Sequence, residues 1–351
     1  MKHMIFGESH GPAIGVSLSG VPAGVELNME EIAFELARRA PGKSPLSTAR
    51  READIPEILS GVFEGRTTGT PLCAVIRNTD QHSKDYTQLR THPRPGHADF
   101  PGFFRYEGCN DYRGGGHFSG RLTAPLVFAG AVAKQVLALE GISVGAHIAA
   151  VDGIPDIDFL ETDLTPELFR AVAEKSFPVL DDAQGERMQA AILDAKEQQD
   201  SVGGLIQCAV LGLPAGIGSP DYGENVEGLF AQQLFAVPAV KGVSFGRGFD
   251  MALMRGSECN DPIRVRNGEI TLSRNVNGGI NGGITNGMPI LCTAAIRPTP
   301  SIAREQQTVD LDTFENSTLT VTGRHDPCVV HRAVPVIEAA CALAVCQLLG
   351  I

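Results

Sequence analysis

The 351-residue sequence has no Trp and only 4 Tyr, and its 41 acidic residues outnumber its 29 Lys and Arg residues, for a net charge of −12. Sequence-independent nucleic-acid binding needs basic surfaces, so this composition argues against it. Hydrophobic residues make up 43% and charged residues 20% of the chain, which excludes disorder as the main state. The length predicts roughly two domains or one large domain.

The sequence also lacks the motifs that would assign a nucleotide, dinucleotide or zinc site. It contains no GxxxxGK[ST] segment, and Gly114–Gly116 does not have the GxGxxG spacing of a dinucleotide site. HExxH is missing, and His92 and His97 are five residues apart with no thiol pair near them. We therefore predict no metal site and no triphosphate site.

Targeting and redox signals are equally sparse. The 8 Cys residues include no CxxC pair and lie mostly in apolar runs, which is typical of reduced, buried thiols. The chain begins MKHMIFGESHG, without a basic and then apolar leader, and Lys134 and Glu338 interrupt its most apolar stretches. We expect a soluble cytoplasmic protein with no membrane partner.

The acidic residues are concentrated in one segment. Residues 140–200 hold fourteen acidic and four basic residues, which is typical of a solvated face. The remainder of the chain is nearly neutral, so its basic residues are available to cluster around an anionic small molecule.

Local patterns predict several elements. Asn28 is a typical helix N-cap with Glu31 three residues later, and the helix should end near Arg39. Residues 77–121 are polar and rich in glycine, which predicts a long functional loop system. Apolar runs predict strands at 62–63, 72–76 and 205–213, and helical spacing predicts helices over 121–139, 186–199 and 339–349.

Weak internal echoes predict a repeat. Val21-Pro-Ala-Gly24 reappears as Leu213-Pro-Ala-Gly216, Glu57-Ile-Leu-Ser60 as Glu269-Ile-Thr-Leu-Ser273, and Gly69-Thr-Pro71 as Gly287-Met-Pro289. The order is the same in both sets, although coincidence in a chain rich in Gly and Pro remains the alternative. The echoes predict two similar halves, about 1–140 and 201–351, with an acidic insert at about 141–200, and the glycine-rich loops of both halves could converge on one cleft.

Glycine-rich segments with basic residues could carry the chemistry. Glycine lets backbone N–H groups approach a phosphate closely and Arg adds bidentate charge, so these segments favour an anionic ligand. Arg50 and Arg51 form a further basic pair without a structural explanation, and histidines suit proton transfer. The glycine-rich segments are Gly7–Gly11, Arg94–His97, Arg113–Arg121, Asn277–Gly283 and Gly323–Pro327.

Several long strings of the sequence together resemble the chorismate synthases. They occur in that family's order over nearly the entire chain. The resemblance implies a single domain, 1–351, with an α/β (α+β) fold, a β-α-β sandwich in which helices pack between two antiparallel sheets. The strings are Phe6-Gly-Glu-Ser-His-Gly11, Arg94-Pro-Gly-His-Ala-Asp99, Asp111-Tyr-Arg-Gly-Gly-Gly116, Ser119-Gly-Arg121 and Gly323-Arg-His-Asp-Pro-Cys328.

The resemblance also implies an activity. Chorismate synthases are lyases of the shikimate pathway, in aromatic amino acid biosynthesis, that convert 5-enolpyruvylshikimate 3-phosphate to chorismate by a 1,4-anti elimination of phosphate. They are homotetramers and require reduced FMN (FMNH2), although the reaction has no net redox change. The sequence leaves open whether this chain reduces its flavin with NADPH, and the missing nicotinamide fingerprint favours an external flavin reductase as a partner.

Roles for individual residues follow from the same motifs. His10 resembles the residue that protonates the departing phosphate, His97 the one that keeps the flavin in its reactive protonation state, and Asp326 the group that helps to remove the C6 proton through flavin N5. The implied substrate ligands are Arg39, Arg51, Arg121 and Arg324. The implied flavin contacts are His117, Phe118, Ser119, Pro238, Ala239, Gly282, Arg297, Pro298, Thr299, Pro300, Ser301 and Arg324.

The sequence departs from the family at three places. The chain starts almost at the first motif, Pro45 stands where many members have a basic residue, and His117-Phe118 replaces the commoner Arg-Ser pair. Two other functions remain as alternatives: a non-enzymatic flavin-binding or phosphate-binding protein, and a nucleotide-dependent transferase. The transferase requires a triphosphate loop, which the sequence lacks.

Overall fold

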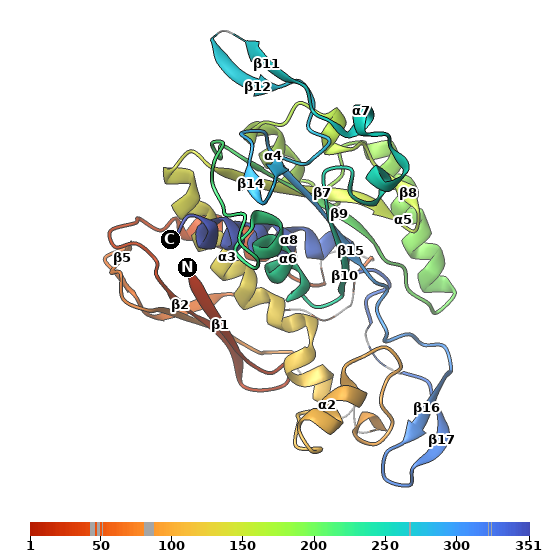
Figure 1. Ribbon diagram of the computed structural model, residues 1–351. Helices are drawn as coiled ribbons and strands as arrows, with labels where there is room; N and C mark the ends of the chain where they lie inside the picture. The colour runs from red at the N-terminus through yellow and green to blue at the C-terminus, as the bar shows by residue number, and fades with distance from the viewer. Residues whose placement is uncertain are drawn as a thin grey trace.

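A computed structural model describes residues 1–42, 46–47, 50, 52–80, 88–266, 268–321, 323 and 325–351 (Figure 1). Helices and strands are mixed along the chain, and the paired strands are antiparallel. The predicted combination of helices with antiparallel sheets is therefore confirmed. Most of the buried apolar side chains belong to one continuous core.

The first sheet has four strands in the order β1-β2-β6-β3. Its strands alternate buried and exposed residues only in part, because β2 and β6 are the central strands and β1 and β3 the edges. The bounds are β1 Lys2–Gly7, β2 Ala13–Ser19, β3 Pro56–Ser60 and β6 Leu72–Arg77.

The second sheet has five strands in the order β10-β15-β9-β7-β8. Helices α4 and α5 and the apolar cluster around Phe159 and Phe169 contact β7, β9 and β15 on this sheet. The strands are β7 Ser143–Val151, β8 Ile154–Pro155, β9 Gly204–Leu211, β10 Val240–Phe245 and β15 Ile290–Ile296, and the two helices are α4 Pro166–Ala173 and α5 Asp182–Glu197.

Two long apolar helices connect the sheets. Helix α3, Thr123–Leu139, packs against β2 and β6, while α8, Val330–Leu348, packs against β7 and β9. The two helices also pack on each other so closely that a Cβ on Gly130 would lie 2.2 Å from the Cβ of Ala339. Helices α1, Met29–Arg39, and α6, Val226–Phe235, flank this pair. These contacts support the predicted sandwich, which stays a proposal.

The remaining elements are short. Figure 1 shows that the β11–β12 and β16–β17 ribbons project from the body of the molecule. The ribbons are β4 Val62–Phe63 with β5 Arg66–Thr67, β11 Ile263–Arg266 with β12 Glu269–Leu272, β13 Ile280–Asn281 with β14 Ile284–Thr285, and β16 Gln306–Asp310 with β17 Glu315–Leu319. The short helices are α2 Asp99–Arg105, α7 Gly256–Cys259, η2 Arg113–Phe118, η3 Gly120–Leu122, η4 Phe159–Glu161 and η5 Gly248–Leu253.

One hydrogen-bond pattern occurs twice in the fold. Thr67 Oγ1 donates to the Pro22 carbonyl at 2.5 Å and accepts from the Val25 N–H at 3.0 Å. Thr285 Oγ1 likewise donates to the Pro214 carbonyl at 2.6 Å and accepts from the N–H of Ile217 at 2.9 Å. The matching sites are the predicted VPAG and LPAG echoes. The pattern supports two related halves, and this division remains a prediction.

Other features of the predicted organisation differ from the fold. The segment that starts at Glu57 lies in β3, a strand of the first sheet. Its echo, which starts at Glu269, lies in β12, a strand of a separate ribbon. Part of the predicted insert, β7, lies between β9 and β8 in the second sheet.

Most local predictions are confirmed within a few residues. Asn28 Oδ1 accepts from the N–H groups of Glu30 and Glu31 at 3.0 and 3.2 Å, which caps α1. The last helix begins at Val330 and not near Ala339, because α8 continues through Pro335.

Two segments, Gly120–Leu139 and Val330–Leu348, are long and apolar enough to cross a membrane by length and composition. We expected Lys134 and Glu338 to interrupt these stretches well short of a membrane span, and by length and composition that expectation was wrong. In the fold, however, 72% and 83% of their most apolar windows are buried. Lys134 and Glu338 form an ion pair with each other, so both charges are compensated.

The cysteines are free, and five of them are buried. Cys208, Cys292 and Cys341 place their Sγ atoms within 4.8 Å of one another, close enough to hold a metal ion by distance. They lie among the apolar residues of the core, on β9, β15 and α8. The sequence did not indicate this grouping.

Candidate active site

The turn Gly114–Gly116 packs against the two histidines with predicted catalytic roles. The three glycines have φ of 58°, 84° and 52°, a region that favours glycine. A Cβ on Gly114 would lie 2.1 Å from Cε1 of His10, and a Cβ on Gly115 would lie 3.0 Å from Cε1 of His97. The absence of side chains on this turn therefore lets the backbone pass close to both imidazoles.

His10 is 5% exposed, so its imidazole is held inside the protein. Burial lowers the pKa of His10, and the positive charge of Arg50 lowers it further. A cavity lies beside this turn. Gly114, the residue next to the His10 ring, lines this cavity, whereas His10 itself does not.

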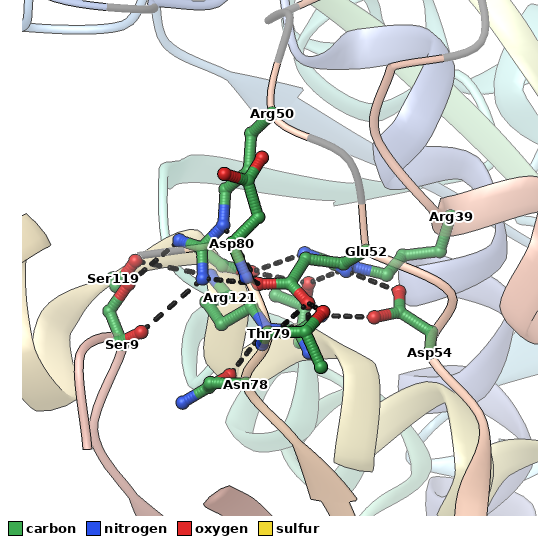
Figure 2. Close-up of polar contacts among 12 residues, drawn as sticks. Ser9, Arg39, Arg50, Glu52, Asp54, Asn78, Thr79, Asp80, Ser119 and Arg121 are labelled. Atoms are coloured by element: carbon green, nitrogen blue, oxygen red, sulfur yellow. Dashed lines mark hydrogen bonds and ion pairs between the residues drawn. The ribbon is translucent and has the colours of Figure 1, made fainter. Parts of the chain in front are cut away.

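Three arginines and two acids form a buried network beside this turn (Figure 2). Asp54 accepts from Arg39 Nη1 at 2.7 Å and also from Nη1 of Arg121. Arg50 pairs with Glu52 at 2.8 Å, and the Arg121 guanidinium lies 3.8 Å from the same carboxylate. Two carboxylates thus hold three guanidinium groups together, and Asp80 lies beside them in Figure 2.

Burial and charge act in opposite directions on these groups. Burial would raise the pKa of Asp54, but Arg39 and Arg121 lower it below its ordinary value. Burial lowers the pKa of Arg39 to about 10 although Asp54 opposes that shift.

Nη2 of Arg121 is the atom that lies 3.8 Å from Glu52, too far for a hydrogen bond. Arg121 Nε donates to Asn78 Oδ1 at 3.0 Å, and the residue is only 4% exposed. Among the residues that the structure describes, Nη2 has no hydrogen-bond partner. A buried donor without a partner is costly, so an anion that accepted this hydrogen bond would stabilise the site.

Two further charged residues lie at the start of α8: Asp326 just before the helix and Arg332 in its first turn. Arg332 Nη1 donates to both oxygens of Asp326 at 2.9 and 2.8 Å, and Arg332 Nε donates to the carbonyl of Arg39 at 3.1 Å. The hydroxyl of Thr299 donates to the Asp326 carbonyl at 2.6 Å. Arg332 thus connects Asp326 to the arginine network.

Two segments of the second sheet complete the cavity. Strands β10 and β15 are antiparallel with Val240 opposite Ile296, so the residues before β10 and those after β15 lie at one sheet end. The Arg297 N–H donates to the Ala239 carbonyl at 3.0 Å, and Ala239 has φ 73°, unusual for a residue with a Cβ. Burial lowers the pKa of Arg297.

These groups surround one cavity of about 270 Å³. Its lining combines guanidinium groups with apolar atoms of Phe118, Val237, Pro238 and Ile296. Such a surface can bind a ligand with several negative charges beside a flat apolar ring.

Comparison with known proteins identifies the family. A family model for chorismate synthase matches residues 1–349 of the chain. The chain belongs to the chorismate synthase family. Chorismate synthases are lyases of aromatic amino acid biosynthesis, so the predicted resemblance and enzyme class are confirmed.

Individual relatives agree with the family model. The chorismate synthase of Thermococcus kodakarensis is 44% identical over 345 residues, which are 98% of this chain and 94% of the relative. That of Korarchaeum cryptofilum is 46% identical over 349 residues, 98% and 94% of the two chains. A crystal structure of a chorismate synthase superposes with a TM-score of 0.77 at 29% identity and covers 99% of this chain and 91% of that one.

The structure brings most of the residues assigned by resemblance to chorismate synthases into this one cavity. Their individual roles remain predictions. Arg51 and Arg324, like Pro45, lie outside the described residues. The predicted residues that line the cavity are Arg39, His97, Phe118, Ser119, Arg121, Pro238, Ala239, Arg297, Thr299, Pro300, Ser301 and Asp326.

Four assigned residues that the structure describes do not line the cavity: His10, His117, Gly282 and Pro298. His117 Nδ1 lies 2.9 Å from the Gly7 carbonyl, and Pro298 follows the cavity residue Arg297. Gly282 lies between β13 and β14, where a Cβ would contact nothing within 4 Å.

Several residues of the site were not assigned from the sequence. Arg94 and Asp99 lie within the quoted Arg94–Asp99 motif, so the motif contained the signal. Arg50 was noticed only as a charge without a structural explanation, and it lines the cavity. Asp54 and Arg332 had no distinguishing local signal.

Proposed function

We propose that this chain catalyses the chorismate synthase reaction, the 1,4-anti elimination of phosphate from 5-enolpyruvylshikimate 3-phosphate to give chorismate, with reduced FMN as cofactor. One observation carries the proposal: arginines, the His97 imidazole and the Asp326 carboxylate, from distant parts of the chain, line one cavity with an apolar surface. The substrate has a phosphate and two carboxylates, and the guanidinium groups of Arg39, Arg50 and Arg121 that line the cavity suit such an anion.

The leaving phosphate gains negative charge as its C–O bond breaks. Arginines held in advance by Asp54 and Glu52 need no reorganisation to stabilise that charge, and they act in a site with little water. Arg121 Nη2 supplies a donor that is still available to the ligand.

His10 and Asp326 handle protons in this proposal. The lowered pKa of His10 keeps it neutral in the empty site, and a dianionic phosphate would raise that pKa and let the imidazole donate to the leaving group. Asp326 helps to remove the proton from C6, and Arg332 fixes the orientation of its carboxylate. One C–H and one C–O bond break and one C=C bond forms, so the reaction is redox-neutral.

The residues present fit a reduced flavin. Pro238 and Ala239 offer apolar atoms for a ring, and Arg297 and Ser301 offer donors for its polar edge or phosphate. When bound, a reduced flavin would supply an electron-rich ring beside the C–O bond that breaks. We also propose that the chain forms a homotetramer in the cytoplasm and receives its reduced flavin from an external reductase.

An anaerobic assay tests the function. The purified chain is mixed with substrate and photoreduced FMN, and phosphate and chorismate are measured; we expect equal amounts of both and neither without FMN. A non-enzymatic flavin-binding protein would bind FMN and release no phosphate, and this result would overturn the proposal. Oxidised FMN with NADPH replaces photoreduced FMN in a second arm, where we expect no turnover until a flavin reductase is added.

A further inference from the structure

The carboxylate of Asp99 is held on both of its oxygens by Arg94. Oδ2 accepts from the Arg94 backbone N–H at 3.1 Å and from Nε at 2.7 Å, and Oδ1 accepts from Nη2 at 2.8 Å. Asp99 is 8% exposed, and Arg94 is 5% exposed. This two-point contact fixes the orientation of the carboxylate inside the protein.

His97 completes a triad with this pair. Its Nδ1 lies 2.6 Å from Asp99 Oδ1 and 3.1 Å from Nη2 of Arg94, so the carboxylate is the nearer partner, and the same Nη2 lies 3.4 Å from Nε2. Burial would raise the pKa of Asp99, but hydrogen bonds from Arg94 and His97 lower it well below its ordinary value, so the group is an ionised acceptor. Because an ionised carboxylate cannot donate, the proton of this hydrogen bond belongs to Nδ1 of His97.

The opposite edge of the imidazole faces the glycine turn. A Cβ on Gly115 would lie 3.0 Å from Cε1 and 3.1 Å from Nε2 of His97. His97 lines the cavity together with Gly114, the residue before Gly115. Burial lowers the pKa of His97, the hydrogen bond to Asp99 opposes that shift, and the positive charge of Arg94 adds to it, so the net effect is a lowered pKa. A neutral ring with its proton on Nδ1 has an unprotonated Nε2.

We propose that Asp99, itself held by Arg94, is a positioning residue that fixes His97 in the Nδ1–H tautomer and leaves Nε2, on the edge beside Gly115, as a hydrogen-bond acceptor. The inference deepens the proposed function and rests on it for its catalytic consequence. A ligand atom placed against this edge must therefore be a donor, such as a ring N–H or a hydroxyl group, and a second acceptor would be rejected.

Arg94 also connects this triad to the predicted flavin segment. Its Nη1 donates to Ser301 Oγ at 3.0 Å, across 207 positions of sequence. The same guanidinium therefore holds the acid that orients His97 and a residue that lines the cavity after β15. A shift of this segment would be transmitted to the His97 imidazole through one side chain.

Solid-state NMR of the full chain with ¹⁵N-labelled histidine rings tests the tautomer directly. The signals of His97 are assigned by their loss in His97→Gln. At pH 7.5 without ligand we expect a protonated Nδ1 and an unprotonated Nε2. In Asp99→Asn we expect a substantial population of the Nε2–H tautomer, since the neutral amide no longer requires a donor.

Kinetics of the same variant test the consequence. Asp99→Asn should lower kcat by about 10- to 100-fold, as for other residues that orient a functional imidazole, with KM much less affected. Asp156→Asn is the matched control, because Asp156 contacts Nδ1 of the buried His147 at 3.0 Å and does not line the cavity. It should change the His147 signals and leave those of His97 and the turnover unchanged.

Two results would overturn the inference: a wild-type His97 with its proton on Nε2, or an Asp99→Asn protein, folded by circular dichroism, that keeps both tautomer and turnover. Failure of the proposed function is distinguishable, because wild type would then release no phosphate while the tautomer could still be measured.

Discussion

Asp54 Oδ2 lies 2.7 Å from Nη1 of Arg39, and both side chains are almost completely buried. The second oxygen of Asp54 accepts from Arg121, so one carboxylate orients two of the arginines that we assign to the substrate. Asp54 also has φ 50°, a backbone conformation that Asn tolerates better than most residues with a side chain.

Asp54→Asn therefore removes the charge with little backbone strain. We expect the free energy of unfolding to fall by about 3–5 kcal/mol, because two buried guanidinium groups lose their common partner. Chemical denaturation measures this loss. Glu57→Gln is the control: the exposed Glu57–Arg77 pair should contribute only about 0–1 kcal/mol.

Inorganic phosphate provides a second test of the same contact. If the unpaired guanidinium groups bind anions, phosphate should raise the melting temperature of Asp54→Asn more than that of wild type. Equal increases of the melting temperature in both proteins would show that Asp54 does not contact the groups that bind the anion.

Gly114→Ala tests the close approach of the glycine turn to His10. A Cβ there would lie 2.2 Å from Nδ1 of His10 as well as close to Cε1, so the imidazole must move. We expect turnover to fall by about 10²-fold, since misplacement by about 1 Å is enough for such a loss. Gly153→Ala is the control with a similar φ of 76° and open space around its Cβ; it should keep normal turnover.

The local elements of the fold could be predicted because their signals are short-range. The cap at Asn28 and the periodic pattern of α3 depend only on residues that are close together in the sequence. The predicted last helix began near Ala339, whereas α8 begins at Val330 and continues through Pro335. Proline removes a helix hydrogen bond, yet packing of the buried helix outweighs that local cost. Tertiary contacts decided this element.

The site could be predicted only as far as motifs reached. His97 and Asp326 were found through strings that resemble a family. Arg332 and the bridging role of Asp54 depend on contacts between segments far apart in sequence, such as Arg332 with the Arg39 carbonyl across 293 positions. No local pattern encodes such a contact.

His331 should make stability depend on pH. It is 8% exposed and stacks against Phe177, and its Nδ1 has no hydrogen-bond partner among the described residues. Burial lowers its pKa to about 4, Arg332 adds to the shift and Asp326 opposes it. The neutral form is therefore favoured by folding, and its stabilisation is complete above pH 6.5, the ordinary value, and is lost as pH falls toward 4.

His331→Leu should remove this dependence. We expect the wild type to lose about 3 kcal/mol relative to the variant between neutral pH and pH 4. Urea denaturation of both proteins across this range measures the difference. Parallel stability curves would contradict the assignment of the low pKa to His331.

His10→Ala and His97→Ala test the proton-transfer roles. Each should lower turnover by about 10²- to 10⁴-fold, the usual contribution of a general acid or base, while thermal melting shows an intact fold. The anaerobic assay with photoreduced FMN measures the rates. Nearly normal turnover in both variants would remove their catalytic assignment.

The central claim is that one cavity holds the anionic substrate against the flavin. A crystal structure of the chain with oxidised FMN and 5-enolpyruvylshikimate 3-phosphate tests it most directly. We predict the flavin ring against Pro238 and Ala239 and a substrate oxygen accepting from Arg121 Nη2, with Asp326 beside the substrate ring. A structure in which the flavin and the substrate occupy separate places, or in which neither contacts this cavity, would contradict the account.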